Sequence, residues 1–345
     1  MIKVVITIVS YNSAKKIIDC LNSLRQADFS GIDYKLVIVD NASSDDTFDV
    51  IRNNFTDAEL ILNDENLGFA GANNQGYQFA LNWGADYLFL LNDDTIVAKD
   101  FLQSALLSAQ SDARIGAVQS KLLLWPEKDL INSYGNQLTF YGLAYCGDYR
   151  QPNRDGQPKD LAYPSGASVL LRMSALKKSG LFDDDFFMYH EDVDLGWRLR
   201  LAGYRIILEP KSSVYHKYQF TKSNYKYFYA ERNRLIVLLT NYQLKTLLLL
   251  FPVLVLIEFF LLLVAYQGGW LKEKFLGYQW LFDNSSKLFE RRRYIDSIRV
   301  MTDQDIVSLF SAKVDFSELP HIFLTRLANY WLQCVWLFLR FLIVW

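Results

Sequence analysis

The first third of the chain alternates short, apolar, β-branched runs with amphipathic stretches. Strands that are apolar on both faces belong to parallel sheets covered by helices, so this pattern predicts an α/β fold. We expect strands at Ile2–Val9, Tyr34–Val39, Glu59–Leu62 and Tyr87–Leu91, and helices at Ala14–Arg25, Thr47–Asn53 and Ala70–Trp83.

Polar residues follow each of these predicted strands. In such sheets, ligands bind beyond the carboxyl ends of the strands, and a fold built only for stability has little reason to place polar groups there four times. The pattern therefore predicts a ligand site at one edge of the sheet. The groups are Ser10-Tyr11-Asn12, Asp40-Asn41, Asn63-Asp64 and Asn92-Asp93-Asp94.

Composition narrows the class of protein. The 345 residues include 36 Lys and Arg and 38 Asp and Glu, so the net charge is −2. A chain without a global basic field is not expected to coat nucleic acid. Three distant cysteines (Cys20, Cys146 and Cys334) match no metal-binding spacing and favour a reducing compartment. The first residues lack a signal-peptide core, so we expect the active part to stay in the cytoplasm.

Asp93 and Asp94 directly follow an apolar strand. Two adjacent carboxylates at a ligand edge suit Mg²⁺ or Mn²⁺ bridged to a diphosphate, because hard divalent ions take one or two carboxylates plus substrate oxygens. The alternative is an acidic turn that caps the next helix.

Glu191, Asp192 and Asp194 open a predicted amphipathic helix that runs through Arg200. Acidic residues in a first turn complement the helix dipole. The aromatic and apolar residues around them also suit a general base, because burial raises the pKa of a carboxylate. At this point both interpretations stay open.

Three further segments belong to the same edge. Asn66–Gly76 leads into a helix with small and amide residues that could face an anion, but it is neither a Walker loop nor a G-x-G-x-x-G turn. Tyr163–Ser168 is a tight loop that enters the strand Val169–Leu171. His216 follows another predicted strand and is either an ordinary surface or core histidine or a site residue.

The last third has a different character. Leu247–Tyr266 is apolar and about long enough to cross a bilayer, for which roughly 20 residues are needed, but Pro252 and Glu258 interrupt it. Basic residues flank it, and the chain ends in a Trp-rich apolar segment, which favours helices that lie in or re-enter a membrane surface. A hydrophobic subdomain or an oligomer interface is the alternative. The basic flank consists of Arg232, Arg234, Lys245, Lys272, Lys274, Lys287 and Arg291-Arg292-Arg293.

Taken together and in order, several segments resemble glycosyltransferase family 2, inverting enzymes of the GT-A fold. They are ITIVSYNS, VIVDNASSDDT, ENLGFAGANNQG, FLLNDDT, PSGASVLL and GLFDDDFFMYHEDVDLGWRLRLAGY. Within the family, HEDVDLGWR and the leucine-rich C-terminal part look most like bacterial rhamnosyltransferases of surface-polysaccharide biosynthesis. The resemblance implies a mixed, Rossmann-like α/β sheet flanked by helices. It further implies a catalytic domain at 1–220, with nucleotide-sugar binding in 1–105 and the acceptor side in 106–220, and a membrane-associated helical region at 221–345.

The resemblance also implies roles for individual residues. Asp40 would read the base, with Ser10 and Asn12 near the nucleotide. Asp192 would be the general base, with Glu191 and Asp194 orienting it or binding the acceptor. The remaining candidates line the diphosphate, sugar and metal: Asn66, Gly68 and Asn74 for the diphosphate and sugar, Asp94 for the metal with Asp93 beside it, and His216 near the metal or diphosphate. The family's D-x-D motif reads Asn92-Asp93-Asp94 here, with an amide in the first position.

The implied function is metal-dependent transfer, with Mg²⁺ or Mn²⁺, of a sugar from a dTDP- or UDP-linked donor. The best guess is L-rhamnose from dTDP-L-rhamnose, moved to a lipid-linked glycan, such as one on polyprenyl diphosphate, at the cytoplasmic face of a bacterial membrane. The alternatives are a UDP-hexose or UDP-N-acetylhexosamine transferase, a polyprenyl-phosphate sugar synthase, a sugar-1-phosphate nucleotidyltransferase, and a non-catalytic scaffold subunit of glycan assembly.

Overall fold

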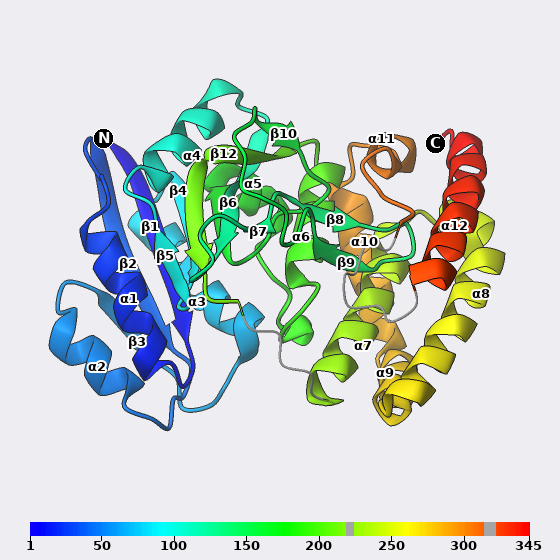
Figure 1. The fold of residues 1–345 in the computed structure, drawn as a ribbon, viewed down its shortest axis with the longest axis horizontal. Helices are drawn as coiled ribbons and strands as arrows, with labels where there is room; N and C mark the ends of the chain where they lie inside the picture. Colours follow the sequence, from blue (N-terminus) through cyan, green and yellow to red (C-terminus); the bar gives the residue numbers. More distant parts are fainter. Residues whose placement is uncertain (219–223, 314–321) are drawn as a thin grey trace.

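The computed structural model describes residues 1–218, 224–313 and 322–345. In those ranges a mixed sheet runs in the order β10-β12-β6-β11-β4-β1-β2-β3, with β5 beside β12 and β7 beside β6 (Figure 1). The strands are β1 Ile2–Ser10, β2 Ile32–Asp40, β3 Glu59–Leu62, β4 Tyr87–Asn92, β5 Thr95–Val97, β6 Ile115–Leu124, β7 Ile131–Ser133, β10 Lys159–Asp160, β11 Ser168–Arg172 and β12 Arg205–His216, and a separate hairpin joins β8 Asn136–Leu138 to β9 Ala144–Cys146.

Helices cover both faces of the sheet. On one face, α1 and α4 bury apolar residues such as Ile17, Leu21 and Phe101 against the strands. On the other face lie α3, α5 and α6. These helices are α1 Ala14–Arg25, α2 Thr47–Asn54, α3 Gly68–Trp83, α4 Phe101–Ser111, α5 Met173–Ser179 and α6 Glu191–Leu201, with a 3₁₀ turn, η1, at Asp184–Phe186. The mixed α/β sheet flanked by helices that we expected is confirmed.

Helices also fill the C-terminal region, on the side of α6 away from β1 (Figure 1). Their apolar core is continuous with that of the sheet: Trp197 of α6 packs edge-on against Tyr242 and Phe310, and Trp336 stacks on Phe140 with ring centroids 4.6 Å apart. The helices are α7 Asn224–Asn241, α8 Leu244–Gly268, α9 Leu271–Asp283, α10 Ser285–Ile298, α11 Asp303–Val307 and α12 Ile322–Leu342. The expected domain boundary between 220 and 221 lies outside the described residues.

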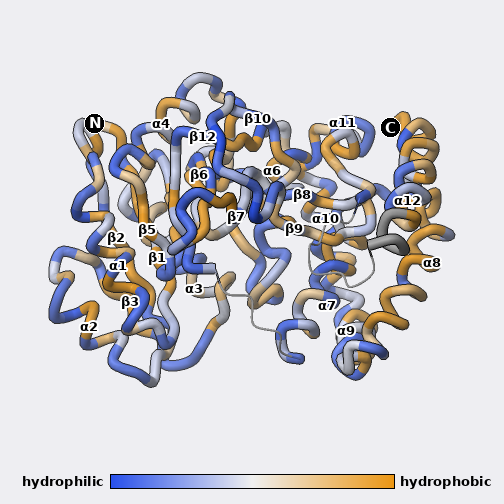
Figure 2. Tube along the Cα trace, viewed as in Figure 1, coloured by the Kyte–Doolittle hydropathy of each residue, from blue (hydrophilic) through white to orange (hydrophobic). Residues whose placement is uncertain are grey.

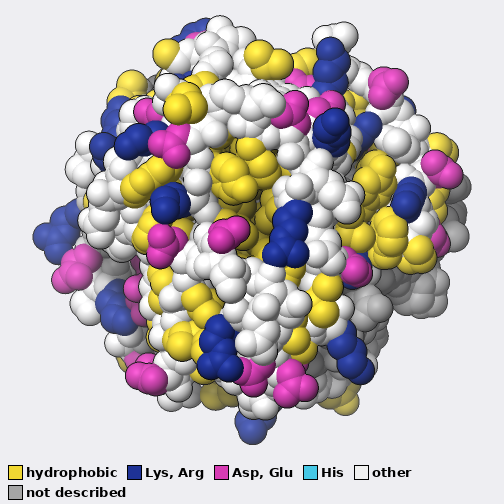
Figure 3. All heavy atoms as spheres, turned by 90° about the vertical axis from the view of Figure 1, so that its left-hand side faces the viewer, with side chains coloured by type: hydrophobic (Ala, Val, Ile, Leu, Met, Phe, Trp, Pro, Cys, Tyr) yellow, Lys and Arg dark blue, Asp and Glu magenta, His cyan; other side chains and the backbone are white. Residues whose placement is uncertain are grey.

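α8 is continuous through Pro252. It is the one helix of the described ranges long and apolar enough to cross a membrane, and only about a tenth of its most apolar stretch is buried. Figure 2 shows α8 and α12 as largely apolar helices at the end of the molecule far from β1. By contrast, the opposite end mixes acidic, basic and apolar side chains (Figure 3).

Glu258, which interrupts the apolar run, faces an inner ion-pair cluster. Nζ of Lys274 lies 2.7 Å from Glu258 and 2.5 Å from Glu231, and Arg234 lies 2.5 Å from Glu258. Because paired charges tolerate burial, this cluster explains how a carboxylate sits within so apolar a helix. The expectation that the basic flank faces lipid headgroups is therefore wrong for Arg234 and Lys274, each 1% exposed, and also for Arg232, which is buried.

Candidate active site

The polar residues that follow the parallel strands meet at one edge of the sheet. Ser10 pairs with Asp40, and the preceding residue, Val9, pairs with Asn92. β12 runs parallel to β6 and antiparallel to β5, so that His216 lies opposite Thr95 at this same edge. The prediction that the strand ends gather their polar groups on one edge is confirmed.

Around Asp40, short polar side chains hold the turns after β1 and β2 together. Asp40 is buried and accepts a hydrogen bond from the Ser43 hydroxyl. Asn12 is exposed and left-handed, with φ 51°, and its Oδ1 accepts from the amide of Ser44 at 2.8 Å. Ser10 is buried, and its hydroxyl donates to the Val39 carbonyl at 3.4 Å. Asp40 and Asn12 thus lie in adjoining turns at the edge, with Ser10 beneath them.

Asn41, to which we assigned no role from the sequence, organises the neighbouring loop. Its Nδ2 donates to Oδ1 of Asn66 at 2.9 Å and to the Gly68 carbonyl at 3.2 Å. Its Oδ1 accepts from the Leu67 amide at 3.0 Å and from Nδ2 of Asn63 at 3.0 Å. One buried amide therefore fixes the loop that carries Asn66 and Gly68.

Gly68 touches the segment that precedes α6. Its φ is +73°, and a Cβ there would lie 2.5 Å from the Phe187 carbonyl oxygen, so both the backbone conformation and the space exclude a side chain. Asn74 bonds to the same segment, with Nδ2 donating to Oδ1 of Asp184 at 2.7 Å and to the Phe182 carbonyl at 2.8 Å. In this structure both residues join α3 to that segment.

Asp94 and His216 face each other at the end of β4. Oδ1 of Asp94 lies 3.1 Å from Nε2 of His216, yet it is buried and receives no aligned hydrogen bond from any described residue. Nδ1 of His216 lies 2.9 Å from Oδ1 of Asn132, a residue of β7 that we did not single out from the sequence. Because an amide oxygen only accepts, Nδ1 carries a proton, and Nε2 is the ring nitrogen that faces Asp94; in the neutral imidazole, which a metal requires, Nε2 presents its lone pair there.

Two lone-pair atoms this close fit two ligands of one cation. Adjacent ligands of an octahedral ion, each at about 2.1 Å from it, lie about 3 Å apart, as these two atoms do. Hard divalent ions complete such a shell with water and substrate oxygens. In the described ranges, no cluster of three or more His, Cys, Asp or Glu could hold a metal.

The two carboxylates of the acidic pair, Asp93 and Asp94, differ in the direction of their pKa shifts. Burial, and next the charge of Asp94, raise the pKa of Asp93 to about 6. Burial alone would raise the pKa of Asp94 as well, but the contact with the His216 imidazole and the charge of Lys16 outweigh it and lower the pKa. Asp94 is therefore the member of the pair that stays ionised down to the lower pH.

Asp192 reaches the same edge from the first turn of α6. Its Oδ2 accepts from the Gly166 amide at 3.3 Å, and the next carbonyl, that of Ala167, accepts from the Asn92 amide at 3.0 Å. The loop before β11 thus connects Asp192 to the end of β4. Burial raises the pKa of Asp192 to about 6 against these hydrogen bonds. Burial and the Asp192 charge raise the pKa of Glu191 further, and its buried Oε2 has no hydrogen-bond partner among the residues that the structure describes.

Asp194 lies apart from these groups. Its side chain is fully buried between Arg198, with Nε 2.7 Å from Oδ2, and Arg291, with Nη2 2.6 Å from Oδ2. Burial alone would raise the pKa of Asp194, but the charges of Arg198 and Arg291 lower it to about 2. Asp194 is therefore an internal anchor of α6, and a bound molecule has no access to it in this conformation.

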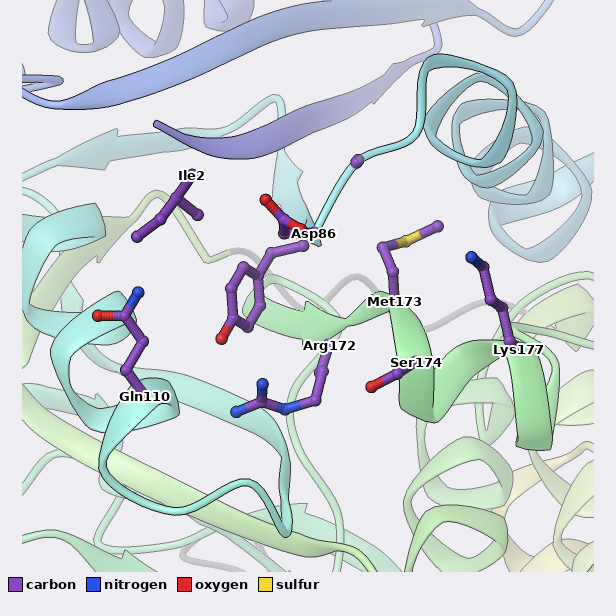
Figure 4. Close-up of a pocket in the computed structure, with 9 residues that line it drawn as sticks. Ile2, Asp86, Gln110, Arg172, Met173, Ser174 and Lys177 are labelled. Carbon is purple, nitrogen blue, oxygen red and sulfur yellow. The ribbon is translucent and has the colours of Figure 1, made fainter.

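A cavity of about 450 Å³ lies at the other edge of the sheet, where β1 and β4 begin. Figure 4 shows Asp86, Gln110 and Arg172 around it. The Arg172 guanidinium is already engaged, since Nε donates to the Ile115 carbonyl at 2.8 Å. We therefore place the candidate site at the carboxyl ends of the strands and not at this cavity.

Comparison with known proteins identifies the family to which the chain is similar. The family model for glycosyl transferase family 2 matches residues 5–180. Poly-beta-1,6-N-acetyl-D-glucosamine synthase of Staphylococcus aureus (strain COL) is 29% identical over 202 residues, which cover 58% of this chain and 46% of that one. The chain thus spans about half the length of this curated relative. N-acetylglucosaminyl-diphospho-decaprenol L-rhamnosyltransferase of Mycobacterium tuberculosis (strain CDC 1551 / Oshkosh) is 26% identical, covering 52% of this chain and 66% of that one.

Solved structures share the fold. GalNAc-T7, crystallised with UDP, GalNAc and Mn²⁺, has a TM-score of 0.56 at 12% identity, covering 70% of this chain and 48% of that one. Residues 1–349 of S. aureus TarS give a TM-score of 0.50 at 15% identity, covering 96% of this chain and 89% of that one. The resemblance drawn from the sequence motifs, in family and in fold class, is confirmed.

Proposed function

The chain belongs to glycosyl transferase family 2, and from this premise we propose that it is an inverting, metal-dependent glycosyltransferase. It moves a sugar from a nucleotide diphosphate donor to a hydroxyl of a glycan acceptor. Residues 1–105 bind the donor and 106–220 supply the acceptor side and the base. The helices of 221–345 hold the enzyme at the cytoplasmic face of a bacterial membrane, as a peripheral or monotopic protein.

One observation carries the proposal: the two chemically active carboxylates reach the same sheet edge from separate elements. Asp94 ends β4 beside His216, and Asp192 opens α6 beside Gly166. The loop before β11 joins them through the bond between Ala167 and Asn92. An inverting transfer needs this separation, because the base and the leaving group act on opposite faces of the sugar ring.

In the proposed reaction, Asp192 takes the proton of the acceptor hydroxyl. The acceptor oxygen then bonds to the anomeric carbon while the bond from that carbon to the diphosphate oxygen breaks, which inverts the configuration. A raised pKa suits Asp192 to this role, because a base whose pKa is near the working pH is both ionised and effective. The Gly166 amide holds the carboxylate in place.

Asp94 and His216 would hold Mg²⁺ or Mn²⁺ at the diphosphate. When bound, the cation would neutralise the negative charge that develops on the leaving nucleotide diphosphate. Asp93, with its raised pKa, lies beside them. Asp40, Ser10 and Asn12 bind the base and ribose side of the donor. Asn66, Gly68 and Asn74 form the wall on the diphosphate and sugar side.

For the donor we propose dTDP-L-rhamnose, and for the acceptor a glycan on a polyprenyl diphosphate. The mycobacterial relative named for L-rhamnosyl transfer to a diphospho-decaprenol acceptor supports this choice. The exposed apolar residues of α8 support it too, because a lipid-linked acceptor lies at a membrane surface.

A UDP-N-acetylhexosamine or UDP-hexose donor is the second candidate. The staphylococcal relative, a poly-N-acetylglucosamine synthase, favours it. A non-catalytic scaffold of glycan assembly is the alternative from another class. It is disfavoured because a scaffold needs neither a paired Asp94 and His216 nor a carboxylate with a raised pKa at Asp192.

A donor panel tests the proposal. The full-length chain in detergent, with Mn²⁺ or Mg²⁺ and a polyprenyl-diphosphate-linked N-acetylglucosamine acceptor, is given each common UDP-, dTDP- and GDP-sugar, and nucleotide release is measured. We expect release from dTDP-L-rhamnose, and its loss in Asp94→Ala and Asp192→Asn. Release confined to a UDP-sugar would establish the second candidate, and silence with every donor and acceptor would favour the scaffold.

A further inference from the structure

Side chains of the C-terminal helices hold the segment that leads into the proposed base. This segment, Asp183–His190, has three residues with positive φ, between 62° and 64°. Nδ2 of Asn233 on α7 lies within hydrogen-bonding distance of the carbonyls of Phe186, Met188 and Tyr189, at 2.9, 2.9 and 2.7 Å. A backbone in so unfavourable a conformation persists only where its surroundings fix it.

Arg291 of α10 joins the start of this segment to α6, the helix that follows it. One guanidinium nitrogen pairs with Asp183, which caps the 3₁₀ turn η1, and the other lies 2.6 Å from Asp194 in the first turn of α6. The guanidinium also lies over the Phe186 ring, 4.6 Å from its centroid. The Arg291 side chain is 10% exposed, so these contacts are largely shielded from water.

Asp192 and Asp194 lie on nearly opposite sides of α6, because two residues turn an α-helix by about 200°. Contacts that hold the Asp194 side chain in the interior therefore set the rotation of α6 about its axis, and with it the direction in which Asp192 faces the site. Arg198 also holds Asp194, but it lies on α6 itself and reaches the turn that follows α5, with Nη2 2.5 Å from the Leu181 carbonyl. Arg291 differs because it ties α6 to the start of the strained segment.

We propose that Arg291 is a positioning residue for the transfer reaction: by clamping Asp183 to Asp194, it sets the carboxylate of Asp192 at the acceptor. The helical region after α7 would then form part of the active site in addition to serving as a membrane anchor. This inference rests on the proposed function, because it assigns Arg291 to the base of that reaction. The clamp itself does not require a donor and can be measured alone.

The experiment compares Arg291→Met, Arg291→Lys and Asp183→Asn with Arg293→Met, a control on the exposed side of α10. In Arg291→Met, Asp194 keeps Arg198 and Asn241 as partners, so no buried charge is left alone. Asp183→Asn removes only the outer ion pair and serves if the Arg291 variants do not fold. Hydrogen–deuterium exchange of the full-length chain is measured for peptides covering 184–193 and, as an internal reference, 87–97.

We expect exchange in 184–193 to be about tenfold faster in Arg291→Met and unchanged in 87–97, because only the clamped segment is released. With the donor that proves active, kcat should fall about 10- to 100-fold, because displacing a catalytic group by about 1 Å can reduce the rate by that factor. The KM for the donor should stay within about twofold. Arg291→Lys should recover part of kcat, and Arg293→Met should match the wild type.

Unchanged exchange in 184–193 for both Arg291→Met and Asp183→Asn would overturn the clamp. Faster exchange with kcat within twofold of the wild type would overturn the positioning role. If the wild type itself releases no nucleotide from any donor, the proposed function fails while the exchange data still decide the clamp, so the two failures are distinguishable.

Discussion

His216 is held between Asn132 and Asp94, with Nδ1 2.9 Å from the amide oxygen and Nε2 3.1 Å from the carboxylate. Asn132 thereby sets which ring nitrogen carries the proton, and a metal-ligating histidine depends on such a partner for its tautomer and orientation. We therefore expect Asn132→Ala to weaken Mn²⁺ binding by about 10- to 100-fold. Electron paramagnetic resonance of Mn²⁺ titrated into the full-length chain with UDP present measures this without turnover.

The matched control is Asn136→Ala. Asn136 is also buried nearby, but its Oδ1 accepts from the Ser133 hydroxyl at 2.7 Å. We expect Mn²⁺ affinity to be retained in this variant. Equal losses in the two variants would indicate a general disturbance of β7 and β8, and an unchanged affinity in Asn132→Ala would remove Asn132 from the site.

The pH dependence of kcat/KM should follow Asp192. Burial raises its pKa to about 6, and only the ionised carboxylate accepts a proton. The rate should therefore be constant above that pKa and fall about tenfold per pH unit as the pH drops below it. Asp192→Asn should reduce kcat by about 10²- to 10⁴-fold and abolish this limb, as measured by nucleotide release between pH 4.5 and 8.5.

Asp93 provides the rival explanation for the same limb, because its pKa is also raised to about 6. The two are separated by the profile of Asp93→Asn, which should keep the acidic limb if Asp192 produces it. A limb that disappears in Asp93→Asn and persists in Asp192→Asn would reassign it to the acidic pair.

Gly68→Ala should damage the site more than Gly84→Ala does. Both glycines have positive φ, +73° and +70°, so each substitution carries a similar backbone strain of about 1–2 kcal/mol. Only at Gly68 would the new Cβ meet another atom, the Phe187 carbonyl oxygen at 2.5 Å, whereas nothing lies within 4 Å at Gly84. We expect a loss of activity of at least tenfold in Gly68→Ala and little loss in Gly84→Ala.

Thermal unfolding supplies the reference for this comparison, since both variants should lower the unfolding temperature. If the activity of the two variants falls in proportion to that loss of stability, the contact between α3 and the segment before α6 has no role in the reaction.

The N-terminal half was readable from the sequence because local pattern and tertiary environment agree there. The helix Ala14–Arg25 and the strand Glu59–Leu62 have the predicted bounds, and the strand ends meet at one edge because the strands are parallel and end in register. Even so, Ile18, an apolar residue of this helix, is 38% exposed. Propensity and periodicity suffice to predict strands in a sheet that helices cover on both faces.

Partners distant in sequence could not be read in the same way. Asn132 lies 84 residues before His216, and nothing in its surroundings distinguishes it from any other asparagine of a short strand. Arg291 stands in a run of three arginines that suggests a membrane flank, yet it lies inside the fold beside Asp194. Charge alone indicates neither burial nor partner, because a paired arginine and an exposed one look alike in a sequence.

The apolar stripe of α8 leads to the remaining prediction. Phe251, Val255 and Phe259 follow one another at four-residue intervals, so they share one helix face, and their exposed fractions are 62%, 51% and 55%. Fully burying a phenylalanine contributes about 1.5–3 kcal/mol, so we expect Phe251→Ser with Phe259→Ser to reduce binding to phosphatidylglycerol vesicles by more than about tenfold. Co-sedimentation with the vesicles measures this, and Leu107→Ser on α4, 69% exposed at a distant surface, is the control. If the double variant sediments with the vesicles as the wild type does, α8 does not bind the lipid. If the double variant instead differs from the wild type in oligomeric state in solution, this face of α8 is an interface between copies of the chain.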